Sequence, residues 1–289
     1  MIDPFDKFTT PTAPATTSSV APIPTVIPGS EVYQELHGVG KRSLWVVTVL
    51  MGVSSLVFYT LAARAPLSKR IFHILTSLIT TISFIIYLAL STGQGITTKH
   101  ATIHERHKHV PDTDTEYIRQ VLWLRFVNWA LTTPLLFINF ALLSGLPGAN
   151  LLIAIVAHLT MLATALLGIF AGHGRERWVW LTLTCISYLV VIYHVGFHAQ
   201  RAAKSKDVQA RRLFGSISGS GIAMLALFPI VDTETVLFAI QDVFTQGILG
   251  YWLLFAYENT PGIALYMEGF WSHGVGNEGA IRISDEEGA

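Results

Sequence analysis

Apolar residues are gathered into seven long runs separated by polar connections, and each run is close to the roughly 20 residues that a helix needs to cross a bilayer. Within lipid, each backbone polar group has to find its hydrogen bond inside its own segment, so we expect helices and no sheet. The pattern predicts an all-α membrane protein, a bundle of seven transmembrane helices. The predicted spans are 44–63, 71–92, 118–143, 150–170, 177–198, 213–231 and 234–257.

The segments that flank the spans predict the domain organisation and the orientation. Residues 1–43 are rich in Thr, Pro and Ser and show no signal-peptide pattern, so we expect a disordered tail before the transmembrane domain of residues 44–257. Basic residues concentrate in the connections after the first and the fifth span, which the positive-inside rule places in the cytoplasm. The N-terminal tail is then extracellular, and the tail of residues 258–289 is cytoplasmic, most simply at the plasma membrane.

The composition favours a membrane protein and argues against a nucleic-acid partner. With 51% hydrophobic and 13% charged residues and a mean hydropathy of +0.50, the chain suits lipid as its main partner, and a second copy of the chain is another candidate partner. A formal net charge of zero argues against a nucleic-acid partner. Histidines 100, 104, 107 and 109 in the second connection could bind zinc or copper, but no cysteine accompanies them, and we predict no metal site. No constellation typical of an enzyme is present.

Polar residues inside two spans form the candidate site. Asp242 and Gln246 are four residues apart, so they share one face of the seventh span, and intramembrane carboxylates are functional by default. Asp242 is the only mid-span carboxylate, which makes it the expected partner of Arg125; the alternative is that Arg125 reaches interfacial water. We expect a shared interior polar site. The third span contributes Arg125, Asn128 and Thr132 on nearly one face, with Asn139 almost two turns further on.

The third span, from Arg125 to Leu136, resembles helix three of the microbial (type 1) rhodopsins in its Trp129 and its Thr-Thr-Pro sequence at 132–134. Asp242-Val243, Phe228-Pro229 and Tyr87 with Gly93 match the same family in order, and residues 269–283 are similar to the tails of fungal members. The resemblance implies a bacteriorhodopsin-like bundle around retinal, which is held as a Schiff base by a lysine of helix seven. The chain is identified as a fungal opsin-related member of this family.

Three departures from the family pattern bear on function. The resemblance places Gln246 at the lysine position, Asn128 at the proton-acceptor position and Asn139 at the proton-donor position. A primary amide cannot condense with an aldehyde to give an imine, and asparagine does not titrate near neutral pH. We therefore expect no covalent retinal and no proton pumping, and retinal could bind only noncovalently. The lysines elsewhere, at 7, 41, 69, 99, 108, 204 and 206, lie in tails, connections or helix ends.

The resemblance also implies the walls of a ligand pocket, for which core packing is the alternative role. Two positions depart from the family: Leu225 falls where a tryptophan is usual, and Phe228 replaces a tyrosine that hydrogen-bonds the helix-seven aspartate. The implied wall residues are Tyr87, Trp129, His158, Met161, Trp180, Leu225 and Phe228.

Three functions follow as hypotheses. The first is an opsin-related membrane protein without covalent retinal, in the accessory or stress-related role that the likeness to lysine-lacking fungal opsin-related proteins implies. The second is a light-responsive photoreceptor or anion transporter with noncovalent retinal, because Asn128, Thr132 and Asn139 resemble the neutral triplets of inward anion-pumping rhodopsins. The third is a small-ligand binder or passive pore with Arg125 and Asp242 at its polar centre.

Overall fold

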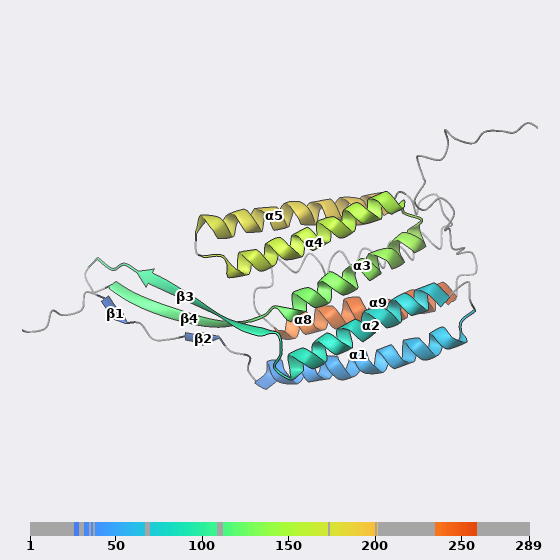
Figure 1. The fold of residues 1–289 in the computed structure, drawn as a ribbon, viewed down its shortest axis with the longest axis horizontal. Helices are drawn as coiled ribbons and strands as arrows, with labels where there is room; N and C mark the ends of the chain where they lie inside the picture. Colours follow the sequence, from blue (N-terminus) through green and yellow to red (C-terminus); the bar gives the residue numbers. More distant parts are fainter. Residues whose placement is uncertain are drawn as a thin grey trace, which may run out of the picture.

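A bundle of long apolar helices forms the body of the molecule in the computed structural model, which confirms the predicted all-α membrane fold (Figure 1). Six helices in the described part of the chain are long and apolar enough to cross a bilayer. They are α1 (Gly38–Arg64), α2 (Arg70–Ser91), α3 (Leu124–Ser144), α4 (Gly148–Phe170), α5 (Arg175–Val191) continued by the π-helix η1 (Ile192–His198), and α8 (Thr235–Asp242) continued by the π-helix η2 (Val243–Ile248) and by α9 (Leu249–Glu258). The structure describes residues 26–28, 32–34, 36, 38–66, 70–108, 112–172, 174–199, 201 and 235–258; the predicted span 213–231 and the predicted tail beyond Glu258 lie outside them.

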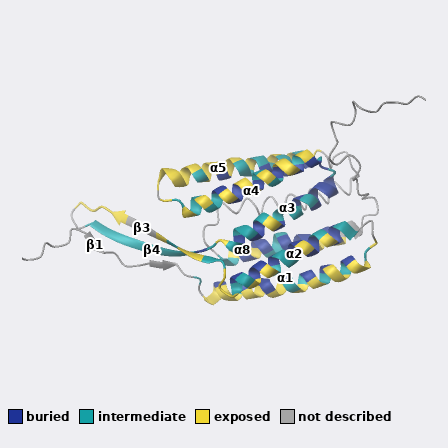
Figure 2. Cartoon of the chain, viewed as in Figure 1, coloured by how far each residue is buried: buried dark blue, intermediate teal, exposed yellow. Residues whose placement is uncertain are grey.

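The helices have a buried face and an exposed face, as Figure 2 shows for α1 and α2. Many of the exposed side chains are large and apolar, and several of the buried ones are polar. In α1, Val46 and Leu56 are exposed, whereas Thr48 and Ser55 are buried. The buried hydroxyls do not lack partners: Thr48 Oγ1 donates to the carbonyl of Leu44, and Ser55 Oγ lies 2.6 Å from Thr81 Oγ1 of α2. This arrangement suits a helix bundle whose surroundings are lipid, where interior hydroxyls bind across helices.

Neighbouring helices approach closely where one of them carries a small residue. A Cβ atom added to Gly250 of α9 would lie 3.3 Å from the ring of Phe58 in α1. Between α4 and α5, Thr164 Oγ1 lies 2.9 Å from Thr184 Oγ1, so this pair of helices shares a buried hydroxyl contact. Small residues and hydroxyls at these contacts are typical of packing between membrane helices.

A sheet precedes α3, and it contradicts the expectation of no sheet. Strands β3 (Ile96–Glu105) and β4 (Asp112–Leu122) form an antiparallel hairpin, and β1 (Val26–Pro28) and β2 (Val32–Gln34) pair with β4 in parallel (Figure 1). The hairpin lies outside the predicted spans, where water can satisfy backbone groups and the restriction to helices does not apply.

Because of the sheet, the start of the third helix and the extent of the N-terminal tail differ from the predicted boundaries. The third helix begins at Leu124 rather than at residue 118, because the apolar residues that precede it belong to β4. Within the N-terminal tail, residues 26–28 and 32–34 are strands, and α1 begins at Gly38, so these residues differ from the predicted disorder through residue 43. A Cβ atom added to Gly95, whose φ is +71°, would lie 2.4 Å from Leu124 Cβ, so the turn into the hairpin requires glycine.

Lys99 fastens the hairpin to the bundle. Its ammonium donates hydrogen bonds to the carbonyl oxygens of Ile169 and, at 2.7 Å, of Ala171, where α4 ends. A lysine at this place satisfies carbonyls that have no partner within the helix and complements the helix dipole. Burial, followed by the positive charges of Arg177 and Arg119, lowers the pKa of Lys99 from its ordinary value.

Candidate functional site

Asp242 lies at the centre of the described bundle, with α2 and α3 supplying its partners. The side chain is 0% exposed. Trp129 Nε1 of α3 donates to one carboxylate oxygen at 2.6 Å, and the Tyr87 hydroxyl of α2 donates to the other. Both oxygens of a buried carboxylate are thus satisfied by neutral donors, and each of these bonds is strengthened by the carboxylate charge.

Arg125 is not the direct partner that the sequence predicted for Asp242. It is buried, at 5% exposure, which contradicts the alternative that its side chain reaches water. Its guanidinium lies 5.0 Å from the ring centre of Phe238, and within the described part of the chain it forms no ion pair with Asp242. Arg125 Nε and Nη2 have no acceptor among the described residues. The bonds from Tyr87 and Trp129 give each carboxylate oxygen a donor without Arg125.

Gln246, in the π-helix η2, binds three side chains through its amide. Its Oε1 accepts hydrogen bonds from Ser83 Oγ and, at 3.1 Å, from Asn128 Nδ2. Its Nε2 donates to Thr132 Oγ1 at 3.2 Å, and Thr132 Oγ1 donates to the carbonyl of Asn128 at 2.8 Å. Both ends of the amide are therefore engaged, so this network holds a glutamine in one orientation.

Ser83 is a site residue that the sequence reasoning missed. It lies four residues before Tyr87 in α2, which is the same spacing that separates Asp242 from Gln246 in the facing helix. In the structure each residue of one pair binds a residue of the other, Ser83 to Gln246 and Tyr87 to Asp242. The matching spacing was the available signal, because residues four apart lie on one helical face.

Asn139 is separate from this network. It is 0% exposed, yet neither atom of its amide has a hydrogen-bond partner among the described residues. The structure therefore places it on the same helix as Asn128 and Thr132 without joining it to their contacts.

His158 of α4 has one satisfied ring nitrogen and one free one. Its Nε2 lies 3.3 Å from the backbone carbonyl oxygen of Trp129, which can only accept, so Nε2 carries the hydrogen. Nδ1 has no partner within the described part of the chain. A neutral His158 therefore offers an unused acceptor inside the bundle.

A cavity of about 50 Å³ lies beside these residues. It has room for roughly three to five water molecules. Among the predicted wall residues, Trp129, His158 and Met161 line it, together with Thr132 and Gln246.

The other predicted wall residues have different places. Trp180 does not belong to the described lining; it is half-buried against α4, where a Cβ atom on Gly168 would lie 3.2 Å from Trp180 Cβ. Tyr87 binds Asp242 instead of lining the cavity, and Leu225 and Phe228 lie outside the described residues.

Comparisons with known proteins identify relatives over most of the chain. The family model described as bacteriorhodopsin-like protein matches residues 40–256. Opsin-1 of Neurospora crassa is 40% identical over 295 residues, covering 96% of both chains, and the opsin-like protein carO of Fusarium fujikuroi is 26% identical over 76% of this chain and 74% of its own.

Solved structures share the fold. The light-driven proton pump LR (Mac) from Leptosphaeria maculans has a TM-score of 0.76 and 34% identity, covering 79% of this chain and 98% of its own. Halorhodopsin, a light-driven chloride pump, has a TM-score of 0.65 at 22% identity, covering 78% of this chain and 98% of its own, and so shows the fold alone.

Proposed function

Because the chain belongs to the bacteriorhodopsin-like protein family, we propose that it is an integral membrane opsin-related protein that binds no retinal covalently and pumps no protons. The observation that carries the proposal is Gln246, at the position where the family resemblance expects lysine. Its amide is held by Ser83, Asn128 and Thr132. A primary amide cannot take part in imine formation, which needs the free electron pair of an amine.

The absence of pumping is proposed from two asparagines. Asn128 and Asn139 stand where the resemblance expects the proton acceptor and the proton donor, and neither amide exchanges a proton near neutral pH.

The proposed role is an accessory or stress-related one in the plasma membrane, without enzymatic activity. The charges of the connections support an extracellular N-terminus and a cytoplasmic C-terminus. Lipid is the proposed partner of the exposed apolar faces, and a second copy of the chain is a further proposed partner.

Absorption spectroscopy with added all-trans retinal tests the proposal. Purified wild-type protein should show only the spectrum of free retinal, and borohydride reduction should add no retinyl mass to the chain. A visible band that hydroxylamine removes would overturn the proposal. Light-driven pH changes in vesicles that contain the protein would overturn the second part of it.

A pair of variants at position 246 tests whether the lack of an amine there explains the lack of a covalent retinal adduct. Gln246→Lys supplies an amine at the network between α2 and α3, and it should gain a covalent retinal adduct. Gln246→Met has a similar length but no amine, and it should remain colourless. If Gln246→Lys forms no adduct, the lost amine does not by itself explain the lack of pigment.

A noncovalent ligand site is the second candidate, and the free acceptor of His158 beside the cavity favours it. A small molecule with a hydroxyl or N–H donor that fits this cavity should quench the tryptophan fluorescence of the protein in a saturable way. His158→Phe, which removes the acceptor and keeps an aromatic ring, should weaken that quenching. Quenching that rises linearly with added ligand and is unchanged in this variant indicates partition into lipid or detergent instead.

A further inference from the structure

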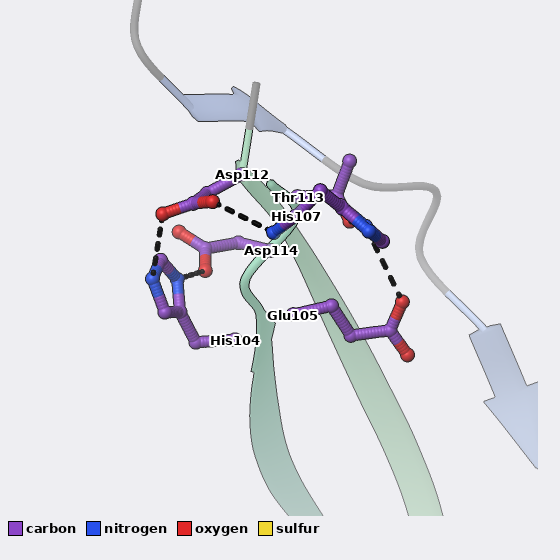
Figure 3. Close-up of polar contacts among 6 residues, drawn as sticks. All are labelled: His104, Glu105, His107, Asp112, Thr113 and Asp114. Atoms are coloured by element: carbon purple, nitrogen blue, oxygen red, sulfur yellow. Dashed lines mark hydrogen bonds and ion pairs between the residues drawn. The ribbon is translucent and has the colours of Figure 1, made fainter. Parts of the chain in front are cut away.

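The β3–β4 hairpin brings histidines and carboxylates together outside the helices. His104 lies between two aspartates of β4, as Figure 3 shows: its Nδ1 is 2.5 Å from Asp114 Oδ1, and its Nε2 is 3.6 Å from Asp112 Oδ2. His104 and Asp114 are also direct cross-strand neighbours in the register of the hairpin. Cross-strand pairs at this distance contribute to the stability of a sheet.

Two further histidines have carboxylate neighbours. His100 Nδ1 lies 2.9 Å from Glu116 Oε1 across the strands. His107 Nε2 lies 3.8 Å from Glu105 Oε2, and its backbone N–H donates to Asp112 Oδ1 at 3.0 Å (Figure 3). Each contact gains attraction when the histidine carries a positive charge.

His104 has a carboxylate oxygen of β4 beside each of its ring nitrogens. A neutral imidazole has one N–H and can donate to only one of the two aspartates, whereas an imidazolium has two and can donate to both. Within the described part of the chain, the ion pairs of Glu105, Asp112, Asp114 and Glu116 all have a histidine as the cation.

Other charged groups near the hairpin do not take the place of the histidines. Lys99 is bound to the end of α4, and in the register it faces Arg119. Arg106 and Lys108 lie at the tip and form no ion pair with these carboxylates in the described structure. On β1 and β2, Tyr33 is the only titratable residue. Among the described residues, the cations paired with these carboxylates are therefore the histidines.

Strand β4 links this cluster to the segment before the first helix. Its Asp112–Asp114 stretch pairs with β1, and its Tyr117–Arg119 stretch pairs with β2. The same strand carries Asp112, Asp114 and Glu116. A change in the stability of the β3–β4 pairing therefore also changes the stability of the β1 and β2 pairing, because β4 is common to all three pairings.

We propose that the hairpin is a proton-binding site outside the membrane spans, and that proton uptake by His100, His104 and His107 tightens the sheet that holds β1 and β2. Histidine changes charge between about pH 5 and 8, so the added attraction is present at the acidic end and is lost as the pH rises.

The exposure of the paired side chains determines how strongly their ion pairs can stabilise the sheet. The paired side chains are between 31% and 58% exposed, so solvent and salt screen each pair. Exposed pairs change an equilibrium by up to about fivefold each, and three of them together should change the opening equilibrium of the sheet by about tenfold. Raising the salt concentration should reduce this change.

Hydrogen exchange of the full chain in lipid nanodiscs tests the proposal. Backbone amides of β1 to β4 should be about tenfold better protected near pH 5.5 than near pH 7.5, after correction for the intrinsic exchange rate. Protection in α1 to α4 should not change in the same way. Equal protection of the sheet at both pH values in the wild-type protein overturns the proposal without any variant.

Three sets of variants assign the effect. Replacing all three histidines by glutamine should remove the pH dependence, whereas His194→Gln with His198→Gln, on η1, should leave it intact. A variant with Asp112→Asn, Asp114→Asn and Glu116→Gln keeps the hairpin histidines and should also lose the pH dependence. A triple histidine variant that retains the wild-type pH dependence refutes the assignment to these residues.

Discussion

Asp242 offers the sharpest test of how the centre of the bundle is held together. Asp242→Asn keeps the size of the side chain but replaces one acceptor oxygen by an NH₂ group. The remaining oxygen can accept from Trp129 Nε1, which only donates, and the NH₂ group can donate to the Tyr87 hydroxyl, which can also accept. Both contacts then lack the negative charge that strengthens them, so the free energy of unfolding should fall by about 2 kcal/mol.

A double-mutant cycle separates this contact from general damage to the bundle. Trp129→Phe removes the N–H donor and keeps an aromatic ring at the same place. The combined variant should lose about 1 kcal/mol less than the two single losses added together, because the bond that Asp242→Asn weakens is already absent in Trp129→Phe. The control pair is Asp242→Asn with Thr164→Val, at the contact between α4 and α5, and these losses should add to within about 0.5 kcal/mol.

The assay is reversible unfolding in mixed detergent micelles, followed by helical circular dichroism. If the losses from Asp242→Asn and Trp129→Phe are simply additive, the carboxylate and the indole do not share a bond, and the geometry described for Asp242 is refuted. The same unfolding titration measures the next variants.

Three other changes have definite expected results. Asn139→Leu should raise the free energy of unfolding by about 1–2 kcal/mol, because it removes a buried amide that has no partner among the described residues. The control Asn128→Leu should lower the free energy of unfolding, because Asn128 Nδ2 binds Gln246. A loss of stability from Asn139→Leu would contradict the prediction. Lys99→Met should increase hydrogen exchange at the base of β3 by about two- to fivefold, with Lys108→Met as a control that leaves it unchanged, because only Lys99 binds the end of α4. Thr164→Val and Thr184→Val should show a coupling of about 0.6 kcal/mol in the unfolding titration, and a coupling of zero would mean that their hydroxyls do not bind each other.

The bundle could be predicted from the sequence because the length of an apolar run and the period of a helix are local properties. The same local reasoning placed Asn128, Thr132 and Gln246 at one polar site, and the structure joins them. It failed at residues 118–122, where a strand with apolar side chains directly precedes α3 and was assigned to the helix. Periodicity alone does not distinguish a short apolar strand from the first turns of a helix.

The sequence by itself determined that this protein is a membrane helix bundle with a glutamine and two asparagines inside its third and seventh spans. Only the tertiary structure decided which groups bind the polar residues of the seventh span. Tyr87 and Trp129, rather than Arg125, bind Asp242, and Ser83 binds Gln246. These partners are between 113 and 163 residues apart in the chain. Their meeting depends on how each helix is rotated and packed against its neighbours, and side-chain direction within one helix does not fix that.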